Sequence, residues 1–221
     1  MALGRRGEAD LLILHDPAGE EAFMAEGFGV ERYALMHNYF ALVGPPADPA
    51  EAGSADGVLD LLARVAVQGA LFVSRGDSSG THVKELGLWR RSGIEPDPSW
   101  YRESGQGMSA TLQMAHELGA YTITDAATFS THDSPLDLAV LIADDPALYN
   151  PYHVVLPSVE RFPWLNGDGG LALASYLRSP QAQAAIAAFG GRAGGPGLFV
   201  PDAASANRPS LMNTPLRQDF T

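Results

Sequence analysis

The chain has 221 residues, of which 46% are apolar, and a formal net charge of −12. This length and apolar content suffice for one large domain or two small lobes and argue against disorder. The negative charge argues against nucleic acid and anionic membranes as partners, although one local site can still be positive enough for a small anion. The absence of cysteine excludes disulfides and thiolate metal sites.

The sequence has no apolar run of membrane-spanning length, so we expect no membrane insertion. Residues 1–7 lead directly into the acidic Glu8 and Asp10, without a signal-peptide pattern. Taken as written, the chain is therefore expected to be cytoplasmic.

The first predicted element is a buried parallel strand over the apolar run Leu11–Leu14. Asp16 is expected to be the N-cap and Pro17 the first residue of a helix that reaches about Glu26. His15 and Asp16 follow a strand's carboxyl end, where a ligand cleft often lies in parallel α/β sheets. The alternative is a strand-end histidine beside a helix cap, and we favour it because no second ligand cluster supports a metal or catalytic role.

A second strand is predicted over residues 39–43, and it ends in Gly44-Pro45-Pro46. This Pro-rich stretch is a candidate crossing point between two lobes. A helix with one apolar face follows and ends near Gly69. Its face has i, i+3, i+4, i+7 spacing and consists of Val58, Leu61, Leu62 and Val65.

The segment 74–82 lies between an apolar run and a helical pattern that begins at Val83. A helix start has backbone N–H groups without partners and partial positive charge, which together favour an anion. Arg75 has a planar fork of donors that matches an oxyanion, and glycine lets the backbone approach a ligand. No nucleotide-type P-loop motif occurs, so the loop suits a small anion. Its glycines and candidate hydroxyl donors are Gly76, Gly80, Ser78, Ser79 and Thr81.

The same loop has a purely structural interpretation. Asp77 or Ser79 could cap the helix, and Arg75 could pair with Asp77 or Glu85. The local sequence leaves both interpretations open.

A second small-residue helix entry occurs at residues 104–107, within a loop that spans residues 100–108. The following helix is expected to pack through Met108, Leu112, Ala115 and Leu118. A strand over residues 121–124 comes next, and Asp125 opens a short helix. His116, His132 and His153 share no spacing that would predict a metal site.

The last predicted elements are strands over 138–142 and 154–156, then helices over about 169–178 and 180–189. Ser179-Pro180 is expected to begin the final helix and Gly190-Gly191 to end it, with an irregular C-terminus. Alternating strands and helices predict a three-layer α/β fold with largely parallel sheets and two lobes. We expect residues 1–44 and 154–221 to form lobe I, and residues 45–153 to form lobe II with the 74–82 loop.

Several segments, in order along nearly the whole chain, resemble the tungstate-binding proteins of ABC importers. They are residues 9–17, 74–82, 100–108, 121–125, 150–153 and 176–181. The resemblance implies a two-lobed, class II periplasmic-binding-protein fold with a ligand cleft. It also implies capture of tungstate, sometimes molybdate, and delivery to an ABC permease in the periplasm or outside the cell. It implies neither an enzyme nor a cofactor, and we expect a monomer.

By this resemblance, Arg75, Ser79, Gly80 and Thr81 would contact the anion. The other candidate ligand-binding residues lie at strand ends or helix starts. They are Ser74, Ser78, Gly107, Thr124, Asp125, His15 and Asp16.

The chain departs from the family pattern at its N-terminus. Family members begin with a signal peptide and a first strand that leads to a Thr/Ser-rich loop, and this chain starts after both. Either the start codon is misassigned or this is a shortened relative with altered function. As written, we expect lobe I to be incomplete and the chain to bind tungstate weakly or not at all. The alternative function is a shortened cytoplasmic relative that acts as a regulatory or interaction module. An enzyme with His15 or Asp77 as a base is a third reading, but it lacks a nucleophile–base–orienter set.

Overall fold

The computed structural model describes residues 1–132, 135–190 and 197–203, and the expected helix stop at Gly191 and irregular tail lie outside these ranges. The chain divides into two compact units. Unit 1 comprises Met1–Met36, Tyr152–Phe189 and the chain from Val200, and unit 2 comprises His37–Pro151 and Gly190–Phe199.

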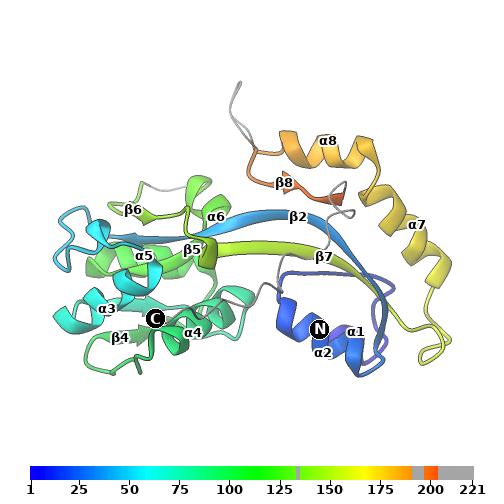
Figure 1. Cartoon of the computed structure of the whole chain (residues 1–221), viewed down its shortest axis with the longest axis horizontal. Helices are drawn as coiled ribbons and strands as arrows, with labels where there is room; N and C mark the ends of the chain where they lie inside the picture. The colour runs from blue at the N-terminus through cyan, green and yellow to red at the C-terminus, as the bar shows by residue number, and fades with distance from the viewer. Residues whose placement is uncertain (133–134, 191–196, 204–221) are drawn as a thin grey trace, which may run out of the picture. The chain divides into compact units, whose positions relative to one another are not determined.

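Two long strands contribute to both units. β2 (Gly29–Gly44) and β7 (Tyr149–Pro157) are hydrogen-bonded neighbours, and the unit boundaries fall inside them at Met36/His37 and Pro151/Tyr152 (Figure 1). The Pro-rich stretch after Gly44, the expected crossing point, lies within unit 2. Only the last third of β2 was predicted, because its first part carries polar and charged residues instead of a continuous apolar run.

Unit 1 contains a strand pair covered by helices. Strand β1 pairs with β7 in the antiparallel direction, with Leu12 opposite Val155, so the expected parallel pairing is wrong here. Asp16 caps α2, because its Oδ1 accepts the Gly19 N–H at 3.2 Å, as the sequence predicts. The elements are α1 (Ala2–Arg5), β1 (Leu12–Leu14), α2 (Pro17–Ala25), α7 (Gly167–Leu177), α8 (Pro180–Ala188) and β8 (Val200–Pro201).

Unit 2 alternates short strands and helices. Its α3, α4 and α5 each end at a glycine in the left-handed conformation, Gly69, Gly93 and Gly119. The elements are η1 (Ala52–Ser54), α3 (Val58–Gln68), β3 (Phe72–Ser74), α4 (Gly80–Ser92), β4 (Tyr101–Glu103), α5 (Met108–Leu118), β5 (Thr122–Asp125), α6 (Ala126–Ser130), β6 (Ala139–Ile142) and η2 (Pro146–Leu148).

The strands of unit 2 combine parallel and antiparallel pairing. Strand β3 pairs in parallel with β4, and Phe72 forms an isolated parallel bridge with Tyr121, the residue before β5. Strands β5 and β6 both pair antiparallel with β2. The prediction of largely parallel sheets is therefore wrong: β5 and β6 run antiparallel to β2, and β1 runs antiparallel to β7. The segment 101–103 was predicted as loop and is instead strand β4.

The core of unit 2 has three layers, as the sequence predicts. Alternate residues of a strand point to opposite faces of a sheet. Phe72 of β3 accordingly packs in one cluster with Leu61 of α3 and Trp89 of α4, whereas the adjacent Val73 packs in a second cluster with Leu112 of α5. None of the helices in the described ranges is both long enough and apolar enough to cross a membrane.

Replacing Leu112 by alanine should destabilise the protein by about 2–5 kcal/mol, because the side chain is fully buried and its loss leaves a cavity. Leu118 on the same helix is 44% exposed, although the sequence pattern placed it on the packed face. Leu118→Ala is therefore the matched control and should lower the free energy of unfolding far less. Urea unfolding followed by circular dichroism measures both, and equal losses would contradict the assignment of Leu112 to the core.

Candidate anion site in unit 2

Helix starts gather at one edge of the unit 2 sheet. The carboxyl ends of parallel strands lie at the same edge, so β3 and β4 deliver α4 and α5 to neighbouring positions. The β3–β4 register pairs Ser74 with Glu103, the last residue of each strand. Two loops, 75–79 and 104–107, therefore begin side by side.

The loop 75–79 brings Arg75 and Asp77 together. The guanidinium forms an ion pair with the Asp77 carboxylate, and the side chains are 18% and 21% exposed. The Arg75 Nε is buried and has no hydrogen-bond partner among the described residues. Arg75 therefore retains donor capacity beyond its pairing with Asp77.

The backbone of this loop is held by its own side chains. Ser79 caps α4, with its Oγ accepting the His82 N–H at 3.4 Å. Asp77 Oδ1 accepts the Ser79 N–H at 3.1 Å. Although burial raises the pKa of Asp77, hydrogen bonds from Ser79 and the Arg75 guanidinium lower it below its ordinary value overall. The structural interpretation of these residues as caps and an ion pair is thus correct, and it leaves the start of α4 ordered.

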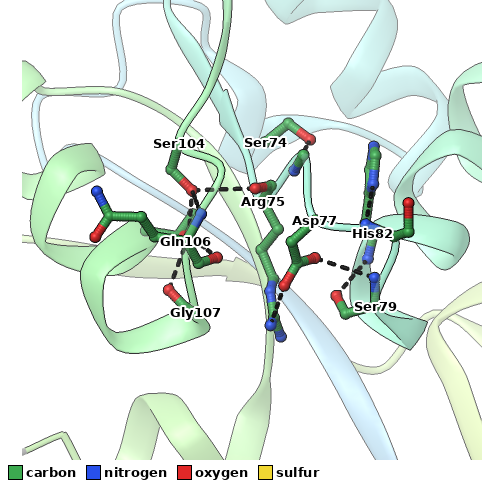
Figure 2. Close-up of polar contacts among 11 residues, drawn as sticks. Ser74, Arg75, Asp77, Ser79, His82, Ser104, Gln106 and Gly107 are labelled. Atoms are coloured by element: carbon green, nitrogen blue, oxygen red, sulfur yellow. Dashed lines mark hydrogen bonds and ion pairs between the residues drawn. The ribbon is translucent and has the colours of Figure 1, made fainter.

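Ser104 joins the two loops, and sequence reasoning did not identify it as a site residue. Its backbone N–H donates to the Ser74 carbonyl at 2.9 Å, and its hydroxyl donates to the Arg75 carbonyl at 3.2 Å. The same hydroxyl accepts the Gln106 N–H at 3.2 Å and lies 2.7 Å from the Thr111 hydroxyl (Figure 2). No local signal marks this role, because the Ser74 and Arg75 carbonyls lie one helix and one strand earlier in the chain.

The start of α5 lacks a side-chain cap, whereas Ser79 caps the start of α4. Gly107 is the N-cap and provides no side chain to satisfy the first-turn N–H groups. A Cβ built on Gly107 would meet no atom within 4 Å, so the space beside this helix start is unfilled by described residues. In Figure 2, Arg75 extends between this helix start and the segment that carries Asp77 and Ser79.

The remaining candidates of unit 2 lie on the loop or helix start, in the core, or at a helix cap. Ser78 lies on the loop, in the left-handed conformation at φ +58°, and Gly80 is the first residue of α4. Ser74, Thr81 and Thr124 are buried, and the Thr124 hydroxyl donates to the Asp125 carbonyl at 3.1 Å. Asp125 caps α6 by accepting the Thr128 N–H at 2.8 Å.

The two candidates at the end of β1 belong to unit 1. Asp16 is engaged in capping α2, and the His15 ring stacks on Tyr152 with centroids 4.9 Å apart. Both observations fit the interpretation of a strand-end histidine beside a cap.

Residues 1–181 match the PBP superfamily domain. The chain belongs to the PBP superfamily. It is 38% identical over 206 residues to the tungstate-binding protein TupA of Peptoclostridium acidaminophilum, covering 92% of this chain and 72% of that protein. It is also similar to an ABC transporter anion-binding protein of Haloferax volcanii, with 39% identity over 220 residues and 97% of this chain covered. The chain spans 64% of the length of this Haloferax relative.

The fold is that of a solved tungstate-binding protein as well. The chain is similar to TupA from Desulfovibrio alaskensis G20 with a TM-score of 0.75 and 36% identity, covering 90% of this chain and 81% of that structure. The expected resemblance to tungstate-binding proteins and to the periplasmic-binding-protein fold is confirmed.

Gly76→Ala should destabilise the protein more than Gly105→Ala. Both glycines have left-handed backbones, at φ +62° and +64°, so the conformational strain of a new Cβ is matched, at about 1–2 kcal/mol. A Cβ at Gly76 would in addition lie 2.8 Å from the Glu103 Cβ, whereas Gly105 has no atom within 4 Å of that position. Urea unfolding of the two variants gives the difference, and equal losses would mean that β4 does not pack against the loop as described.

Proposed function

We propose that this protein is the solute-binding component of an ABC importer and that it binds a tetrahedral oxyanion, tungstate first and molybdate second. The observation that carries the proposal is Arg75, whose guanidinium extends between the starts of α4 and α5 and whose buried Nε lacks a partner among the described residues. The similarity to tungstate-binding proteins and to an ABC transporter anion-binding protein supports the choice of ligand and of permease partner.

The donors around Arg75 suit an anion that carries no proton. In this proposal Arg75 provides charge-assisted hydrogen bonds, and the N–H groups at the Gly107 helix start provide neutral ones. Ser78, Ser79, Gly80 and Thr81 contribute donors from the first turn of α4 and the loop before it. Thr81 is only 5% exposed, so it contributes through its backbone.

Within unit 2, Ser74 ends β3 and Thr124 and Asp125 end β5, and in this proposal they border the anion site. The protein binds and releases its ligand without chemical conversion and without a cofactor, and it works as a monomer outside the cytoplasmic membrane. No observation on the described residues favours the alternative role as a regulatory module.

Arg75→Ala should weaken tungstate binding by at least about tenfold, because a hydrogen bond to a charged group contributes about 1.5–3 kcal/mol. Arg75→Lys should lie between the wild type and Arg75→Ala, since lysine keeps the charge and loses the planar fork. Isothermal titration calorimetry measures all three. The matched control is Arg90→Ala, which removes an equal charge from the last turn of α4, at the far end of that helix from the loop, and should leave the affinity unchanged. Wild-type affinity in Arg75→Ala would mean that Arg75 serves only in its ion pair with Asp77 and does not contact the ligand.

Phosphate at equal concentration should not displace bound tungstate near neutral pH, whereas molybdate should. Hydrogen phosphate carries a proton that needs an acceptor, and the candidate acceptor in the loop is Asp77. Its Oδ1 accepts from Ser79 and its Oδ2 pairs with Arg75, so it is already engaged. Competition calorimetry tests this selectivity. Displacement of tungstate by phosphate would show that Asp77 turns to accept the ligand's proton.

A further inference from the structure

His82 lies in the first turn of α4, beneath the loop that carries Arg75. Its Nδ1 accepts the backbone N–H of Ser78 at 3.0 Å, and the residue is 9% exposed (Figure 2). Ser78 is the residue whose left-handed backbone, at φ +58°, turns the loop toward the helix. A non-glycine residue adopts this conformation only when its surroundings hold it there.

This hydrogen bond fixes the tautomer of the imidazole. A ring nitrogen that accepts an N–H must present its lone pair, so the proton of neutral His82 lies on Nε2. The Nε2 atom is buried and has no hydrogen-bond partner in the part of the chain that the structure describes. An N–H donor therefore faces the interior of unit 2.

Glu85 lies one turn further along the same face of α4, where residues three positions apart are neighbours. Its Oε1 accepts the Tyr101 hydroxyl at 2.6 Å and the Trp89 indole N–H at 3.1 Å. Its Oε2 is buried and makes no hydrogen bond of normal geometry with the described residues. Ser74 also hydrogen-bonds to the Glu85 side chain, and Glu85 interacts electrostatically with His82.

We propose that His82, as its Nε2–H tautomer, is a positioning residue of the anion site. Its Nδ1 accepts the Ser78 N–H and so stabilises the left-handed backbone of Ser78. That backbone conformation orients the adjacent residues Asp77 and Ser79. Asp77 then meets the Arg75 guanidinium, and Ser79 caps α4. The inference rests on the proposed function of the loop as an anion site, and it goes beyond that function by assigning a role to a residue that does not contact the ligand.

Two substitutions separate this role from general packing. The Asn side chain places its amide oxygen at the position of Nδ1, whereas the Gln amide extends to the position of Nε2. His82→Asn can therefore still accept the Ser78 N–H, and His82→Gln cannot. We expect His82→Gln to weaken tungstate binding by about fivefold to tenfold, the value of one hydrogen bond, and His82→Asn to stay within about threefold of wild type.

The affinities are measured by titration calorimetry and compared with urea unfolding of the same variants. A purely structural role predicts that affinity falls in step with stability for both variants, and that result would overturn the proposal. Equal affinities of the two variants would overturn it too. Wild-type protein made from the complete reading frame that fails to bind tungstate would refute the proposed function instead.

The tautomer can be observed without any ligand. Nitrogen NMR of protein labelled with ¹⁵N-histidine distinguishes an Nε2–H imidazole from an Nδ1–H imidazole. We expect the Nε2–H form for His82, assigned by the disappearance of its signals in His82→Asn. An Nδ1–H form would contradict the hydrogen bond from the Ser78 backbone N–H to His82 Nδ1, whether or not tungstate binds.

Discussion

The parallel pairing of β3 with β4 is the constraint on which the candidate site depends. It pairs Ser74 with Glu103 and brings the loops after both strands to the same sheet edge. The Ser104 N–H then reaches the Ser74 carbonyl, and the Ser104 hydroxyl reaches the Arg75 carbonyl. If either strand shifted by one residue, its side chains would exchange faces and these contacts would be lost. The start of α5 lies beside Arg75 only because this pairing holds.

Local structure reconciles an acidic chain with an anionic ligand. The net charge of −12 is distributed over the molecule, whereas Arg75 and the helix starts concentrate donors at one edge. Asp77 neutralises Arg75 while it also caps the Ser79 N–H, so the loop is held in shape by the same carboxylate that offsets its charge. An anion that binds here gains mainly from directed hydrogen bonds and less from long-range attraction.

A buried polar layer supports the loop from inside the core. Glu85 is 1% exposed, and burial raises its pKa above the ordinary value. Tyr101 and Trp89 donate to this carboxyl group and pack with Phe72 in the aromatic part of the core. Directed hydrogen bonds of this kind fix one arrangement of side chains, whereas an all-apolar core tolerates several. The cost of burying Glu85 is consistent with a core that holds the loop in a single geometry.

The sequence by itself determined those features that depend on neighbours in the chain. Asp16 and Ser179 cap the helices they were expected to begin, Ser79 caps α4 as one of two expected candidates, and Gly69 ends α3, because caps and left-handed turns involve residues within about one turn. Tertiary structure alone decided the length of β2, the existence of β4 and the antiparallel direction of β1, since strand pairing joins residues far apart in the sequence. The roles of Ser104 and His82 emerged for the same reason. Each depends on where a folded backbone places an atom, and no local pattern of residue types encodes that position.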